Sequence, residues 1–90
     1  MRTRTLAREQ IIHRANGVVR QHGRDPKRFH VIYDDGNVAW RSTVKIPVPE
    51  LQGHDYQLVM YRPRAQQLGG ELWVVVDRNT GDELRFIELQ

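Results

Sequence analysis

The sequence predicts an α+β domain in which one N-terminal amphipathic helix packs on a curved antiparallel sheet of four to five strands. Three observations predict this class. Residues 5–22 carry apolar side chains at helical spacing, residues 29–62 contain runs rich in β-branched and aromatic side chains, and residues 71–89 have the pattern of a β-hairpin. With 90 residues, the chain is expected to form one domain over residues 1–90.

The predicted helix spans residues 5–22. Thr5 is the expected N-cap, and Gly23 followed by Asp25-Pro26 is expected to end the helix. Gly17 lies in mid-helix, where glycine costs about 1 kcal/mol relative to alanine, so we expect a bend or a close contact there. The apolar face comprises Ala7, Ile11, Ile12, Ala15, Val18, Val19 and His22.

Three strands are predicted next, over residues 29–33, 38–46 and 56–62. Residues 34–37 read Asp-Asp-Gly-Asn, which is typical of a tight hairpin turn between the first two strands. The alternation of apolar and polar residues in 38–46 indicates a strand with one buried and one wet face. Pro47 and Pro49 are expected to end that strand, because proline cannot donate to a ladder.

The last predicted hairpin joins strands over residues 71–78 and 83–89. Gly81 ends its turn and is expected to adopt a positive φ. Both faces of the last strand carry apolar side chains, so we expect this strand to be central in the sheet. The acidic groups around the turn, Asp77, Asp82 and Glu83, are expected to keep it solvated rather than to bind a metal.

The helix is expected to cover one face of the sheet and to leave the other open. Tyr, Trp and Arg are the residue types that anchor protein interfaces. The predicted partner-binding residues on the open face are Arg41, Tyr61, Trp73 and Arg85. The residues predicted to face the helix are Val38, Trp40, Val44, Leu72, Val74, Val76, Leu84 and Phe86.

Composition excludes several classes of protein. The chain has no cysteine, which excludes disulfides and thiolate chemistry. No apolar run approaches the roughly 20 residues that a membrane-spanning helix needs, and the N-terminus lacks the apolar core of a signal peptide. We therefore expect a cytoplasmic protein without a membrane role.

Catalytic and metal-binding patterns are weak. The histidines, His13, His22, His30 and His54, are not spaced for a common metal site. The acid–base candidates are Asp34, Asp35, His30, His54 and Asp55. His54 and Asp55 are neighbours, but adjacent side chains usually point apart, and no Ser or Cys nucleophile motif and no Gly-rich phosphate loop accompany them. We predict no catalytic residue, no metal and no cofactor, and we do not expect an enzyme.

Basic charge is concentrated in the N-terminal third. Residues 1–28 carry eight basic and two acidic groups (+6), and residues 29–90 carry six basic and nine acidic groups (−3), which together give the net charge of +3. A basic stripe of this kind can contact nucleic-acid phosphates. The candidate nucleic-acid-binding residues are Arg14, Arg20, Arg24, Lys27 and Arg28.

The run Trp73-Val74-Val75-Val76-Asp77, followed by Thr80-Gly81 and Leu84, comes after a lone N-terminal helix and several strands. This arrangement resembles the small cystatin-like α+β domains. It is similar to two groups in particular: immunity proteins of the nuclear-transport-factor-2-like fold, found beside bacterial polymorphic toxins, and PepSY domains, which are regarded as inhibitory modules. The resemblance covers most of the chain in element order, although its residues are confined to the last hairpin.

The resemblance implies a bacterial or phage protein that binds a toxin or an enzyme and inhibits it by occlusion. Two alternatives stay open. One is a basic nucleic-acid-associated module that uses the Arg-rich N-terminal helix, and the other is a small-ligand-binding or enzymatic domain of the same broad fold. The sequence also leaves open whether the chain forms a homo-oligomer.

Overall fold

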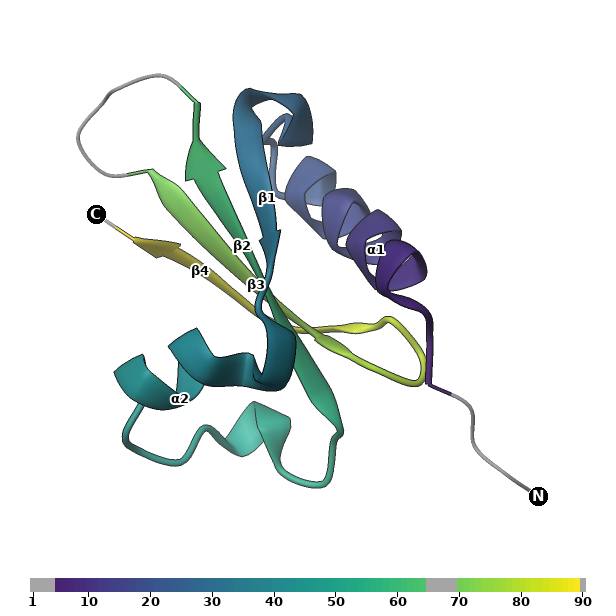
Figure 1. The fold of residues 1–90 in the computed structure, drawn as a ribbon, viewed down its shortest axis with the longest axis vertical. Helices are drawn as coiled ribbons and strands as arrows, with labels where there is room; N and C mark the ends of the chain where they lie inside the picture. Colours follow the sequence, from purple (N-terminus) through teal and green to yellow (C-terminus); the bar gives the residue numbers. More distant parts are fainter. Residues whose placement is uncertain (1–4, 65–69, 90) are drawn as a thin grey trace.

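The computed structural model describes residues 5–64 and 70–89, and these residues form the predicted α+β class. The strands β1 (Phe29–Tyr33), β2 (Tyr56–Pro63), β3 (Glu71–Asp77) and β4 (Glu83–Leu89) form one antiparallel sheet in the order β1-β2-β3-β4. Two α-helices, α1 (Arg8–Gln21) and α2 (Val38–Thr43), lie on opposite sides of this sheet (Figure 1). Short 3₁₀ turns occupy Pro26–Arg28, Asp35–Asn37 and Pro49–Leu51 (η1 to η3).

Helix α1 begins later than predicted and ends as predicted. Its N-cap is Ala7, not Thr5, and the Ala7 N–H donates to the Gln10 side chain at 2.8 Å. At the other end, Gly23 has a φ of 80°, and the Arg24 N–H donates to the Val19 carbonyl at 3.1 Å. This 6→1 bond is half of a Schellman motif, which explains why glycine occupies that position.

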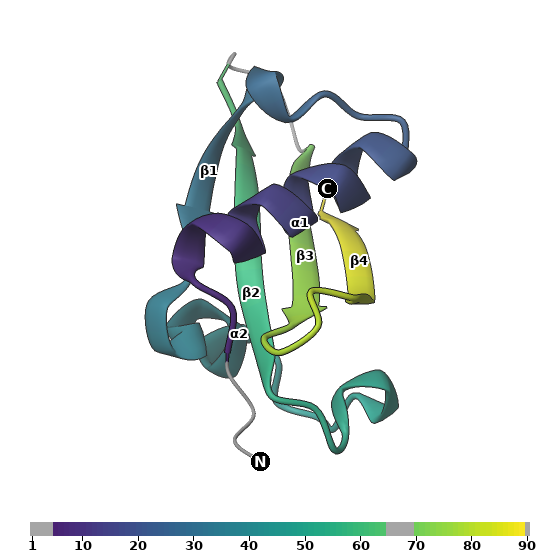
Figure 2. The ribbon, with the colours of Figure 1, turned by 90° about the vertical axis from the view of Figure 1, so that its right-hand side faces the viewer.

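The first core lies between α1 and the sheet. Helix α1 crosses the sheet obliquely (Figure 2), and Ile11, Ala15, Val18 and Val19 bury their side chains against it. The strands contribute alternate residues to this core, as the period of two in a strand requires. They are Phe29, Val59, Tyr61, Leu72, Val74 and Val76, with Tyr33 and Phe86 packed at the margin.

The prediction of a strand over residues 38–46 is wrong, because residues 38–43 form the helix α2. The carboxylate of the buried Asp34 accepts the backbone N–H groups of Ala39 and Trp40, each at 3.1 Å. These are N–H groups of the first helical turn, which have no partner inside a helix. Asn37, with a φ of 54°, redirects the chain into α2, so residues 34–37 do not form the predicted hairpin turn.

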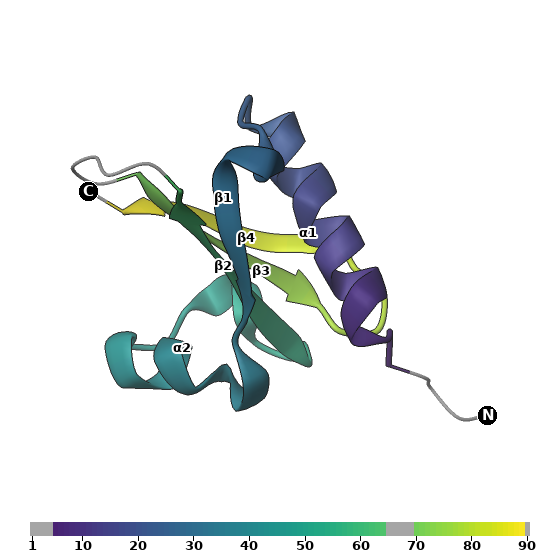
Figure 3. The ribbon, with the colours of Figure 1, turned by 45° about the horizontal axis from the view of Figure 1, so that its top comes forward.

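The second face of the sheet is therefore covered as well, by residues 38–56, which we call the α2 layer. The prediction of an open face is wrong. Figure 3 shows the sheet lying between α1 and the segment that contains α2. A second core cluster forms there, with Trp40 and Leu51 packed on Leu58, Met60 and Trp73.

Half of the residues predicted to face α1 do so. Leu72, Val74, Val76 and Phe86 pack in the α1 core as predicted. The predictions for the other four are wrong: three of them pack against the second core, and Val38 is 60% exposed. Those three are Trp40, Val44 and Leu84.

Strand β4 lies at an edge of the sheet, so the prediction of a central strand is also wrong. A β-bulge explains its apolar residues on both faces. Val76 pairs with Glu83 but Val75 pairs with Arg85, so Leu84 is an extra residue in the ladder. The bulge places Leu84 and Phe86 on opposite sides of the sheet, although they are two residues apart.

Candidate functional site

The four residues predicted to bind a partner do not share one surface. Tyr61 lies beneath α1 with no exposed area, and its hydroxyl donates to Asn16 Oδ1 at 2.7 Å. Burial raises the pKa of the Tyr61 phenol above its usual range. Tyr61 is thus a core residue, and the prediction that it lies on an open face is wrong.

Trp73 is on the side of the sheet away from α1, as predicted, but it is only 6% exposed. The Trp40 ring lies over it, with 6.1 Å between the ring centroids. Its indole N–H donates to Glu71 Oε2 at 2.8 Å. Trp73 therefore packs beneath the α2 layer and is not part of the outer surface.

Arg41 and Arg85 are exposed, and each is tied to a neighbouring turn. Arg41 donates to the Gly36 carbonyl, and Arg85 forms an ion pair with Glu50 of η3. The backbone and then Arg85 hold the pKa of the Glu50 carboxyl below its usual range. The Arg85–Glu50 ion pair joins strand β4 to η3, which is part of the α2 layer.

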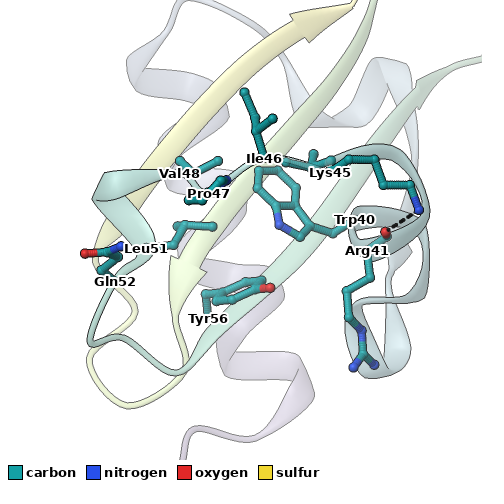
Figure 4. Close-up of a pocket in the computed structure, with 10 residues that line it drawn as sticks. Trp40, Arg41, Lys45, Ile46, Pro47, Val48, Leu51, Gln52 and Tyr56 are labelled. Carbon is teal, nitrogen blue, oxygen red and sulfur yellow. Dashed lines mark hydrogen bonds between the residues drawn. The ribbon is translucent and has the colours of Figure 1, made fainter.

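A groove of about 570 Å³ opens in the outer surface of this layer. Figure 4 shows the Trp40 ring between Tyr56 and the segment that carries Ile46 to Val48. The Ile46 side chain is 76% exposed. The apolar lining comprises Trp40, Val44, Ile46, Pro47, Val48, Leu51 and Tyr56.

The walls of this groove are anchored to the sheet by the local sequence. Pro49 opens the 3₁₀ turn η3, in which the Leu51 N–H donates to the Val48 carbonyl at 3.0 Å. On the other side, the Asn37 side chain donates to the Tyr56 carbonyl and accepts the Leu58 N–H, both at 2.9 Å. The groove is therefore built by short turns anchored to the start of β2, and such connecting segments commonly present binding residues.

The groove carries positive charge at its α2 end. Arg41 and Lys45 line it, and the Lys45 ammonium donates to the Arg41 carbonyl at 3.3 Å (Figure 4). Glu50 lies near the other end, where Arg85 neutralises it. An apolar groove with two cations at one end suits an apolar side chain that has acidic neighbours.

His54 pairs with Asp77 of β3, and its chain neighbour Asp55 lies beside a different residue. His54 Nδ1 lies 2.7 Å from Asp77 Oδ2, and Asp55 Oδ2 lies 3.6 Å from Arg78 Nε. The Asp77 carboxylate also accepts the backbone N–H groups of Asn79 and Thr80, and it is 7% exposed. Asp77 thus caps the β3–β4 turn, and its prediction as a solvating charge is wrong.

Hydrogen bonding by His54, and then by the two turn N–H groups, holds the pKa of Asp77 below its usual range, against the opposing effect of its burial. Within residues 5–64 and 70–89, no three His, Asp or Glu side chains gather in a group that could hold a metal ion. The carboxylates near the hairpin therefore have structural partners.

The predicted basic residues do not form one stripe along α1. Arg14 forms an ion pair with Asp82 at 3.5 Å, and Arg24 pairs with Glu88. Arg24, Lys27 and Arg28 instead line a cleft of about 590 Å³ beyond the end of α1, and Arg20 lies outside its lining. The sequence reasoning missed Arg64, which lines the same cleft from the end of β2. The register of β1 with β2 brings it there, and that register was not evident from sequence.

No protein-family model, no curated protein and no solved structure matches this chain. Across the part of the chain that the structure describes, no helix has the length and apolar composition to cross a bilayer. The groove beside α2 and the basic cleft beyond α1 are therefore the candidate functional sites.

Proposed function

We propose that this chain is a non-catalytic protein-binding module of the inhibitor or immunity type, which acts by occluding a working surface of its partner. The observation that carries the proposal is the apolar groove on the α2 layer, with Ile46 76% exposed at its edge. An exposed apolar groove with a polar margin is characteristic of an interaction site.

The groove favours a segment of another protein as its occupant. Trp40 and Tyr56 supply aromatic surface, and burying a side chain such as Ile46 stabilises a complex by roughly 1.5–3 kcal/mol. Arg41 and Lys45 favour acidic groups by charge complementarity. The partner segment is thus an apolar side chain flanked by Asp or Glu.

The resemblance to cystatin-like domains, and to the immunity and PepSY groups within them, belongs to the same proposal. Those groups imply a toxin or an enzyme as the partner. In this chain the contact surface would be the α2 layer and not the sheet itself, because residues 38–56 cover the sheet on that side.

The test begins with affinity purification of the tagged chain from its native host and identification of the retained protein. The purified partner is then titrated against the wild type and Ile46→Asp. We expect Ile46→Asp to weaken binding about 10-fold or more, because a carboxylate replaces an apolar contact beside an acidic segment; 10-fold corresponds to about 1.4 kcal/mol.

Val38→Asp is the matched control. Val38 is also an exposed aliphatic residue, at 60%, and lies outside the groove lining. Its replacement is expected to change the affinity less than 3-fold, that is by less than about 0.7 kcal/mol. If no protein is retained, or if both variants bind the partner as the wild type does, the proposal is wrong.

A further inference from the structure

We propose that the cleft beyond the end of α1 binds the phosphodiester backbone of nucleic acid. This site is separate from the groove on the α2 layer. The two surfaces share no lining residue, and η1 and α2 lie toward opposite ends of the molecule in Figure 1. The inference therefore does not rest on the protein-binding proposal.

Three chain segments build the cleft. The Schellman turn at Gly23 ends α1, and the 3₁₀ turn η1 follows with Pro26 in its first position. Asp25 Oδ1 accepts the Lys27 N–H at 3.0 Å and so caps that turn. From the end of β2, Arg64 donates its backbone N–H to the Arg28 carbonyl at 3.0 Å and its Nε–H to the Lys27 carbonyl at 3.1 Å. These bonds hold Arg64 against η1.

The charge in the cleft is unbalanced. Of the lining cations, Arg24 is already paired with Glu88. That leaves Lys27, Arg28 and Arg64 against one lining acid, Asp25, whose Oδ1 is engaged by a backbone N–H. The three cationic residues are exposed, so their side chains can reach phosphate oxygens without a rearrangement of the core.

The arrangement suits a strand with several phosphates. The three cations come from two places, η1 (Lys27 and Arg28) and the end of β2 (Arg64), and their side chains are exposed instead of enclosing one small anion. Spaced, exposed cations of this kind bind a polyanion through successive phosphates, with little sequence preference.

The experiment titrates a fluorescein-labelled single-stranded oligonucleotide with the full chain and follows anisotropy over a range of salt concentrations. With three cations engaged, the slope of log K against log salt is expected to be about −2, since each phosphate contact contributes about −0.7 for a single strand. Lys27→Ala and Arg28→Ala should each reduce the magnitude of that slope by about 0.7.

Arg41→Ala is the control, because it removes the same charge at the other surface, and it should leave the slope unchanged. Circular dichroism confirms that each variant is folded. The inference is overturned if no oligonucleotide binds at about 25 mM salt. It is also overturned if the cleft variants keep the wild-type slope, if inorganic phosphate alone displaces the strand, or if polyglutamate binds as well as the oligonucleotide.

Discussion

Two glycines in the chain lie in opposite local environments. Gly81 has a φ of 79°, and a Cβ at this position would lie 2.8 Å from Cγ of Arg14. Gly17 is in the middle of α1, and a Cβ there would meet no atom within 4 Å, so the predicted close contact is wrong.

Gly17→Ala is expected to stabilise the fold by about 0.8 kcal/mol, because alanine restricts the unfolded chain and favours the helix. Gly81→Ala is expected to destabilise it by about 1–2 kcal/mol, because a left-handed conformation is unfavourable for a residue with a Cβ. Urea denaturation of both variants measures the two changes. Equal effects of the two substitutions would contradict this account of the turn.

The role of Asp77 can also be tested by a single substitution. Asp77→Ala removes the acceptor for two turn N–H groups and for His54, so we expect a loss of about 2–3 kcal/mol in the free energy of unfolding. Asp82→Ala, in the same hairpin, removes an ion pair with exposed partners and should cost less than about 1 kcal/mol. Thermal denaturation of the two variants separates the roles, and similar losses would show that Asp77 is an ordinary surface charge.

The lowered pKa of Asp77 also predicts a pH dependence. A carboxyl whose pKa is lower in the folded state stabilises the fold while it is ionised in both states, above its ordinary pKa of about 4. That contribution is lost as the pH falls below 4 and through the lowered pKa. Urea denaturation between about pH 6 and pH 2 should show this loss in the wild type and a smaller loss in Asp77→Asn. Identical pH profiles would contradict the assignment.

At the scale of elements, α2 depends on the buried carboxylate of Asp34. Asp34→Ala removes the acceptor for the Ala39 and Trp40 N–H groups, so we expect a loss of about 2–3 kcal/mol and a more exposed Trp40. A red shift in tryptophan emission, together with denaturation, measures both effects. The neighbouring Asp35 is exposed, and Asp35→Ala should change neither quantity. Wild-type emission from Asp34→Ala would show that the cap does not hold α2.

A long apolar repeat predicts its element more reliably than a short one, as α1 and the segment 38–46 show. Helix α1 was predictable because its apolar residues recur over four turns and glycine and proline follow it. The segment 38–46 was not predictable, because Trp40 and Val44 are four residues apart. That spacing places two residues on one face of a helix and also on one face of a strand. The capping acid Asp34 is the available signal, but Asp at this position is equally typical of a turn.

Two further features, the faces of strand β4 and the position of Arg64, cannot be predicted from the sequence. A single extra residue, Leu84, reverses which face each later side chain occupies, and a bulge leaves little trace in the sequence. The sequence predicts a basic stripe and not a cleft, and of the stripe residues Arg24, Lys27 and Arg28 line the cleft because they are close in the chain. Arg64 was not foreseen, because its place depends on the pairing of β1 with β2.

At the scale of the whole molecule, both faces of the sheet are covered, so the candidate binding surfaces lie on the covering segments and not on the sheet. Tyr61 and Trp73 each belong to one of the two cores, on opposite sides of the sheet. The exposed features are the groove on the α2 layer and the basic cleft beyond α1. Because they share no lining residue, we expect a substitution in one to leave the other unaltered.

Site-specific photo-crosslinking tests the central claim most directly, namely that the α2-layer groove is the protein-binding surface. A benzoylphenylalanine placed at Ile46 lies at the groove, and one placed at the exposed His13 lies on α1, across the sheet. After irradiation in the native host, we predict a covalent adduct with one host protein from position 46 and none from position 13. An adduct of equal yield from both positions, or an adduct only from position 13, would contradict the claim.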